Sequence, residues 1–138
     1  MAEAAFAKVA FELVSPERLL FSAEVDMVVV PGAEGDFGIL PGHSLFLSQI
    51  RPGVIDVYSK GAVTERIFIA GGFAEATPER CTVLADAAVP VSELRRDEIE
   101  PRLRDAKEDL GDAADGAARK TAEREVAVLE AMLAAARA

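Results

Sequence analysis

The chain has 138 residues, with 15 Lys and Arg against 24 Asp and Glu, so its formal net charge at pH 7 is −9. This length indicates one domain, or one domain with an appendage, and the acidic balance argues against binding to nucleic acid or directly to an anionic membrane surface. The single cysteine, Cys81, excludes an internal disulfide. We expect no signal peptide. We also expect no membrane span, because the apolar runs are far shorter than the ~18 residues that a span needs.

Residues 1–87 contain short apolar runs separated by Gly and Pro, a pattern that predicts a β domain. Val9, Phe11 and Leu13 alternate with other side chains, as in a half-buried strand. In residues 25–30, both the alternating set (25, 27 and 29) and its neighbours Val28 and Val30 are apolar, which indicates coverage on both sides. Further strands are predicted at residues 45–50, 54–58, 63–70 and 81–85. Because no helical pattern separates the strands, a sandwich or flattened barrel is favoured over a parallel β-α-β sheet.

The composition changes near residue 88, where the chain becomes rich in Ala, Glu, Arg and Lys, and Pro90 marks the link. The predicted domains are therefore residues 1–87 and 88–138. Two apolar stripes at helical spacing follow: Ile99, Leu103, Ala106 and Leu110, then Ala122, Val126, Leu129, Leu133 and Ala136. They predict an antiparallel helical hairpin, turning over residues 111–116.

Two residues define the expected ends of the first helix. Pro101 lacks the N–H of a helix interior, so we expect a kinked helix or one that starts near Glu100. Gly111 is the expected C-cap of this helix. Since the stripes are short and contain several alanines, the hairpin should be weakly held and able to exchange packing partners.

The sequence shows no constellation that indicates an active site. The Gly-rich run 32–38 is no phosphate-binding loop, and its two carboxylates, Glu34 and Asp36, would repel phosphate. His43 is the only histidine, and a single histidine with a single cysteine argues against a zinc site. Cys81 lies in an apolar run and is expected to be a core residue. We therefore expect a non-catalytic subunit or interaction module, without metal or cofactor.

Four segments in register, together with the opening FELVSPE at residues 11–17, match the pattern of a known family. The segments are VDMVVVPGAEGDFGILPGH at 25–43, IRPGVI at 50–55, GGFAE at 71–75 and VLAD at 83–86. The chain resembles the epsilon subunit of bacterial F-type ATP synthase, the counterpart of the mitochondrial delta subunit. The resemblance implies an α+β fold, with a ten-stranded flattened β-sandwich followed by the helical hairpin.

The resemblance also implies a function and partners. The expected role is a rotor (central-stalk) subunit that couples proton-driven c-ring rotation to ATP synthesis and regulates ATP hydrolysis through the hairpin. Its expected partners are the gamma subunit, the c-ring and, transiently, the catalytic alpha and beta subunits. The expected location is the cytoplasmic face of the bacterial inner membrane, with membrane contact only through the complex.

The resemblance implies roles for individual residues as well. The loops that face the c-ring should contain Ser15, Glu34, Asp36, Pro41, Gly42 and His43, where acidic groups can meet polar or basic ones. The regulatory arm should use Arg119, Lys120, Arg124, Leu129, Leu133 and Arg137. Its second helix carries only one more basic than acidic residue from position 117 onward, so inhibition should be weak. No nucleotide binding is expected, because Arg95 and Glu98 replace the Asp and Arg of the family's ATP motif.

The two-part composition is also compatible with a different class of protein. A free-standing β-sandwich interaction module with a helical oligomerisation tail is the alternative, although it does not explain the motifs in register. Association with a gamma subunit distinguishes the two readings, since only a rotor subunit requires it.

Overall fold

The structure is a computed structural model that describes residues 7–137. The chain divides into two compact units, one ending at Pro90 and the other beginning at Val91. This boundary lies later than the predicted one after Ala87, because Ala88–Pro90 forms a strand that pairs with the β unit.

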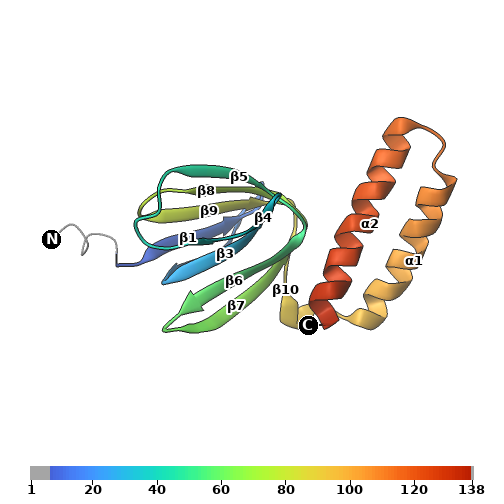
Figure 1. Ribbon diagram of the computed structural model, residues 1–138. Coiled ribbons are helices and arrows are strands. Elements are labelled where there is room, and N and C mark those ends of the chain that lie inside the picture. Colours follow the sequence, from blue (N-terminus) through green and yellow to red (C-terminus); the bar gives the residue numbers. More distant parts are fainter. Residues whose placement is uncertain (1–6, 138) are drawn as a thin grey trace. The chain divides into compact units, whose positions relative to one another are not determined.

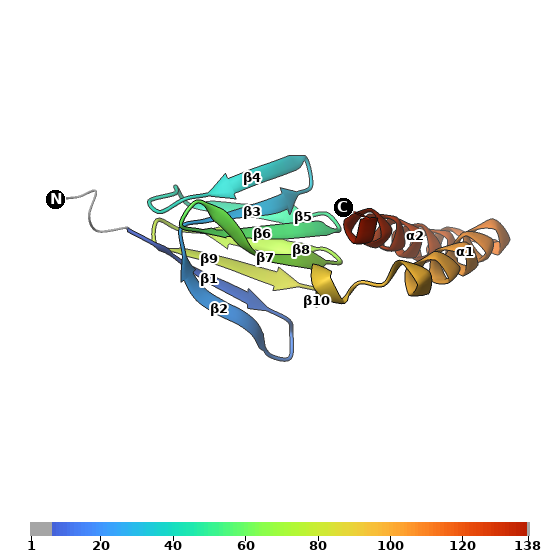
Figure 2. The same ribbon diagram turned by 90° about the horizontal axis from the view of Figure 1, so that it is seen from below.

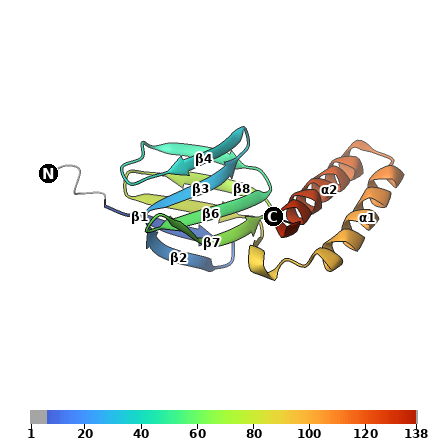
Figure 3. The ribbon, with the colours of Figure 1, turned by 60° about the horizontal axis from the view of Figure 1, so that its bottom comes forward.

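The β unit is one hydrogen-bonded sheet of ten strands, in the order β10-β7-β6-β3-β5-β8-β9-β1-β2 with β4 paired to β3. The strands are β1 (Val9–Val14), β2 (Leu19–Val25), β3 (Met27–Gly32), β4 (Gly35–Ile39), β5 (Phe46–Ile50), β6 (Gly53–Ser59), β7 (Ala62–Ile69), β8 (Gly72–Ala76), β9 (Arg80–Ala85) and β10 (Ala88–Pro90). The sheet curls so that β3, β6 and β7 face β5, β8, β9 and β1 across one core (Figures 1 and 3). The predicted ten-stranded sandwich is confirmed, and the described strand pairs are antiparallel except β1 with β9.

Alternate side chains from both layers form the core of this unit. Val9, Phe11 and Leu13 are buried as their alternation predicts. In β3 the side chains of Val28, Val30 and Pro31 are buried, whereas those of Met27 and Val29 are half-buried, so coverage on the second face is partial. Cys81 is a core residue, as expected, and burial raises the pKa of its thiol to about 12, which keeps it protonated.

Successive strands reverse direction, so their connections gather at two opposite ends of the sandwich (Figure 2). One end, which we call the tip end, holds the connections at residues 15–18, 33–34, 51–52, 70–71 and 86–87. The other, which we call the histidine end, holds residues 26, 40–45, 60–61 and 77–79. At the histidine end Asp26 accepts a hydrogen bond from the Lys60 N–H at 2.6 Å and pairs with Lys8, and these contacts lower the pKa of Asp26.

The second unit is the predicted antiparallel hairpin of α1 (Arg96–Asp112) and α2 (Gly116–Arg137), preceded by the short 3-10 helix η2 (Val91–Glu93) (Figure 1). The buried contact between the two helices, which we call the seam, consists of Ile99, Leu103, Ala106, Leu129 and Leu133, and these residues lie on the two predicted stripes. No helix within residues 7–137 has the length and apolar character needed to cross a bilayer.

The structure excludes one of the two predicted starts of α1. The helix begins at Arg96, with Pro101 inside it, rather than near Glu100. The earlier start places Ile99 in the seam, where it is 3 % exposed, and this burial offsets the one hydrogen bond that Pro101 cannot donate.

The turn between the helices also differs from the prediction. The expected C-cap at Gly111 is wrong, because α1 continues to Asp112 and the Ala113 N–H donates to the Leu110 carbonyl. The Asp115 carboxylate then caps α2 by accepting a hydrogen bond from the Ala118 N–H at 2.8 Å.

Candidate functional site

The tip end carries an acidic hairpin formed by β3, the turn at residues 33–34, and β4. Glu34 and Asp36 are both exposed, but their electrostatic environments differ. Asp36 forms an ion pair with the Arg51 guanidinium at 2.5 Å. Among residues 7–137, Glu34 takes part in no ion pair. The hairpin tip therefore presents one compensated and one uncompensated carboxylate.

Arg51 is the functional-site residue that sequence reasoning missed. It follows β5, and besides binding Asp36 it donates from its second guanidinium nitrogen to the Gly32 carbonyl at 2.5 Å. Its backbone N–H also donates to the Pro31 carbonyl at 2.9 Å. The sequence around Arg51 contains nothing that indicates a partner 15 residues away.

Ser15 lies at the same end, in the loop between β1 and β2. Its N–H donates to the Arg18 carbonyl at 2.9 Å, and its Oγ accepts from the Arg18 N–H at 3.3 Å. The side chain therefore closes its own loop, and the strand directions place Ser15 at the same end of the sandwich as Glu34 and Asp36.

Pro41, Gly42 and His43 lie apart from these residues. They form the loop after β4, and since β4 runs away from the acidic turn, the loop lies at the histidine end (Figure 2). Gly42 has a φ of +81° and its N–H donates to the Pro78 carbonyl at 2.6 Å. One flat partner surface cannot cover both ends of the sandwich.

His43 itself shows no geometry of a catalytic or metal-binding group. Its Nδ1 lies 2.7 Å from the carbonyl oxygen of Ser44, and its ring contacts Phe46 at a centroid distance of 6.1 Å. Within residues 7–137, no group of three His, Cys, Asp or Glu side chains could hold a metal ion.

Apolar side chains are exposed on the outer face of the sheet. Leu19 on β2, Leu84 on β9 and Phe73 on β8 are about half-exposed, at 54 %, 44 % and 50 %. The strand register aligns them in one row, because Val14 pairs with both Leu19 and Leu84, and Leu84 pairs with Phe73. Leu47 on β5 is 69 % exposed. A row of this kind is typical of a protein-protein interface.

The residues predicted to form the regulatory arm divide into two groups. Arg119, Lys120 and Arg124 are exposed along the first half of α2. Leu129 and Leu133 instead lie in the seam, at 1 % and 8 % exposure, where they hold α1 and α2 together. Leu129 cannot contact a partner while the hairpin is closed, since α1 covers it.

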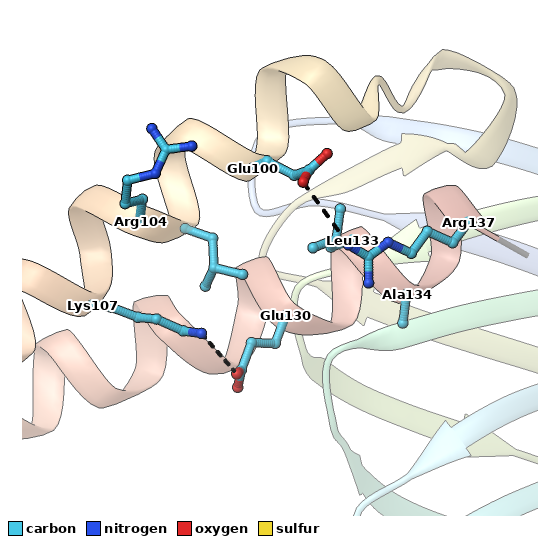
Figure 4. A pocket seen from close by; sticks show the side chains of 8 residues that line it. Glu100, Arg104, Lys107, Glu130, Leu133, Ala134 and Arg137 are labelled. Atoms are coloured by element: carbon cyan, nitrogen blue, oxygen red, sulfur yellow. Dashed lines mark ion pairs between the residues drawn. The ribbon is translucent and has the colours of Figure 1, made fainter.

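A shallow groove of about 530 Å³ lies between the start of α1 and the end of α2 (Figure 4). Its lining comprises Glu100, Leu103, Arg104, Lys107, Glu130, Leu133, Ala134 and Arg137. Two ion pairs bridge it, Lys107 with Glu130 and Arg137 with Glu100, both at 4.0 Å. Arg95 and Glu98 do not line the groove, and they lie 4.0 Å from each other as an ion pair.

The family model and the relatives that match this chain agree on one family. The family described as "ATP synthase, Delta/Epsilon chain, beta-sandwich domain" matches residues 8–91. A protein of Rhodospirillum rubrum named "ATP synthase epsilon chain" is 54% identical over 125 residues, covering 91% of this chain and 93% of its own. A protein of the same name from Paramagnetospirillum magneticum is 53% identical over 128 residues, covering 93% and 96%. The similarity therefore includes the helical unit.

Solved structures show the same fold. A chain in the cryo-EM structure of the Euglena gracilis mitochondrial ATP synthase, described as OSCP/F1/c-ring in rotational state 1, matches with a TM-score of 0.81 and 25% identity, covering 94% of this chain and 81% of that one. A chain of the Tetrahymena thermophila mitochondrial ATP synthase central stalk and c-ring has a TM-score of 0.71 at 16% identity, covering 94% and 96%. The second likeness concerns the fold alone.

Proposed function

The chain belongs to the ATP synthase delta/epsilon chain family, and from this premise we propose that it is a non-catalytic rotor subunit that couples c-ring rotation to ATP synthesis. The observation that carries the proposal is the match over both units, with 91% of this chain aligned to a relative named epsilon chain. A protein-protein interface without an assembled active site suits a subunit that transmits torque. We place it at the cytoplasmic face of the bacterial inner membrane, held there by its partners.

We assign different partners to different surfaces of the β unit. The tip end, with Ser15, Glu34 and Asp36, faces the c-ring, because its exposed carboxylates can meet polar or basic loop groups. The apolar row formed by Leu19, Leu84 and Phe73 faces the gamma subunit, since burial of such side chains is a main source of affinity. The loop with Pro41, Gly42 and His43 lies outside the c-ring contact in this arrangement.

The hairpin is proposed to be a weak regulatory arm. Arg119, Lys120 and Arg124 form its exposed basic surface, and they are the residues offered to the catalytic alpha and beta subunits. Leu129 and Leu133 serve the arm by keeping it folded. Neighbouring acidic side chains reduce the positive charge of α2, which limits attraction to an acidic partner surface.

Removal of the arm tests these assignments together. The chain truncated after Pro90 keeps the whole β-unit core, and we expect it to co-purify with gamma and the c-ring as the full chain does. In the reconstituted enzyme, ATP hydrolysis should rise by less than about fivefold, below the usual range of allosteric coupling. Failure of both chains to co-purify would favour the free-standing module, and a much larger activation would show a strong inhibitor.

We further propose that the chain does not bind ATP tightly. Arg95 and Glu98 pair with each other, and the groove on the hairpin is bridged by two ion pairs of its own residues. A nucleotide would have to displace these pairs and approach Glu100 and Glu130. Calorimetric titration of the isolated chain with ATP should show no site in the low-micromolar range, and detection of such a site would reject this proposal.

A further inference from the structure

The tip of the acidic hairpin is held by Arg51, a residue outside its own two strands, and we call the contacts of Arg51 with the hairpin the brace. Arg51 follows β5 and reaches the β3–β4 hairpin with both guanidinium nitrogens, one at the Gly32 carbonyl and one at the Asp36 carboxylate. The Ala33 N–H donates to the Gln49 carbonyl at 2.9 Å, which ties the turn to β5 a second time. The tip is thus fixed at both sides of the turn at residues 33–34.

The two guanidinium nitrogens of Arg51 bind two separate points of the hairpin. Gly32 precedes the turn and Asp36 follows it, so a planar group bound to both restricts how the turn can bend. A lysine at this position carries one ammonium group and cannot reproduce the planar, two-armed geometry. We infer that Arg51 is a positioning residue, which holds the turn so that the Glu34 carboxylate projects in one fixed direction.

The brace also gives the two carboxylates at the tip different electrostatic environments. The Arg51 guanidinium compensates Asp36, while Glu34 forms no ion pair with any residue of the described range 7–137. Glu34 is therefore the group left for a partner, and its complement is a cationic or hydrogen-bond-donating group on a loop of the facing subunit. This assignment rests on the proposed function, in which the c-ring faces the tip end.

Folding stability is a poor explanation for this arrangement. The side chains of Arg51 and Asp36 are 43% and 62% exposed, and ion pairs exposed to this degree contribute little to stability. Preorganisation of a binding loop, by contrast, improves affinity by reducing the ordering cost at the interface. We therefore expect Arg51 variants to lose binding to the rotor while their thermal transition stays unchanged.

A set of charge-matched variants tests the inference. The dissociation constant of the full chain from a purified gamma–c-ring complex is measured for Arg51→Gln, for Arg51→Lys, and for the double variant Asp36→Asn with Arg51→Gln. The double variant has the net charge of the native chain but lacks the brace, and Asp36→Asn alone shows how much of its loss comes from the Asp36 carboxylate itself. The control is Arg66→Gln, which removes another surface ion pair, Arg66–Asp56 on β7 and β6, whose arginine is about as exposed as Arg51 (41%) and whose aspartate is less exposed than Asp36 (27%).

The variants distinguish an effect of the contacts that Arg51 makes from an effect of the chain's net charge. Arg51→Gln and the double variant should both bind about fivefold or more weakly, in the range of interface electrostatic effects, with Arg51→Lys in between and Arg66→Gln unchanged. Amide exchange of Ala33 and Glu34 in the free chain should accelerate in Arg51→Gln without a shift in thermal transition. Native affinity in the double variant, or unchanged exchange, would overturn the inference.

A separate variant keeps this inference distinct from the proposed function. Glu34→Gln should weaken rotor binding on its own, because it removes the uncompensated carboxylate. If Glu34→Gln binds normally while the native chain still co-purifies, the tip end does not face the partner, and the inference fails although the rotor function stands. If the native chain does not bind the complex, the proposed function fails, and the exchange experiment alone decides whether Arg51 braces the turn.

Discussion

Replacement of Gly72 by alanine should be among the most damaging single substitutions in the β unit. Gly72 opens β8 with a φ of +144°, a conformation that side-chain-bearing residues rarely adopt. A Cβ atom at this position would lie 1.9 Å from the Leu84 carbonyl oxygen and 3.1 Å from the Ala85 Cα. Because both neighbours are backbone atoms of the paired strand β9, they cannot move away by a change of rotamer.

The expected cost follows from two additive contributions. A strained backbone conformation costs about 1–3 kcal/mol, and overpacking in a filled interior costs a further ~1–3 kcal/mol. The sum of roughly 2–6 kcal/mol is a large part of the ~5–15 kcal/mol that stabilises a typical domain. Tyr58 is the only tyrosine, the chain has no tryptophan, and Tyr58 lies in β6, so tyrosine fluorescence during urea unfolding reports on the β unit alone.

Gly35 provides a matched control for this experiment. Its φ is +145°, nearly that of Gly72, but a Cβ there would meet no atom within 4 Å. Gly35→Ala should therefore show the cost of strain without the clash, and lose about 1–3 kcal/mol. Equal losses for the two variants would mean that β9 shifts without cost and that the close approach at Gly72 carries no energetic weight.

The pattern of apolar runs separated by Gly or Pro predicted β1, β3, β5, β6, β7 and β9, but it missed β2, β4, β8 and β10. It failed at Asp26, where β2 ends and β3 begins, because Val25 and Met27 continue the apolar alternation across the break. The bend there depends on contacts of Asp26 with Lys8 and Lys60, which are 18 and 34 residues away. Such contacts exist only in the folded chain, so a local pattern cannot reveal them.

The same reason limited the prediction of the site. The acidic turn and the loop with His43 belong to one continuous motif in the sequence, yet β4 carries the chain from one end of the sandwich to the other between them. The resemblance could therefore group Glu34 with His43, and only the strand directions separate them. Arg51 escaped notice because its role depends on Asp36 and Gly32, which belong to the adjacent β3–β4 hairpin.

In the hairpin, apolar spacing predicted the seam well and local rules predicted the ends poorly. Pro101 and Gly111 both favour a helix boundary in isolation, but α1 runs through both residues. The continuous helix aligns Ile99 and Leu103 with α2, and the packing energy outweighs the local preferences.

Replacement of Leu129 by alanine should unfold the hairpin and leave the β unit intact. Leu129 is 1 % exposed and is the most deeply buried side chain of the small seam cluster. Its truncation should cost about 2–5 kcal/mol, and helices of this length are only marginally stable without partner contacts. The seam offers few other large side chains to compensate, so we expect the helical signal to disappear at a much lower temperature than in the native chain.

Two spectroscopic signals distinguish local from global unfolding in this variant. Far-UV circular dichroism follows the helices, and Tyr58 fluorescence follows the β unit, whose core is a separate cluster. The control is Val128→Ala, the neighbouring position outside the seam cluster, which should cost less than ~1 kcal/mol. A Tyr58 transition that shifts together with the helical one would show that the two units unfold as one.

The Leu129→Ala variant also separates the fold of the arm from its charge. Arg119, Lys120 and Arg124 are all still present in it, so a purely electrostatic inhibitor would keep its effect on ATP hydrolysis. An arm that acts as a folded hairpin would instead lose its effect, and hydrolysis should rise as it does after truncation at Pro90. Equal hydrolysis by Leu129→Ala and the native enzyme, together with an increase on truncation, would place the regulation in the basic residues rather than in the helical packing.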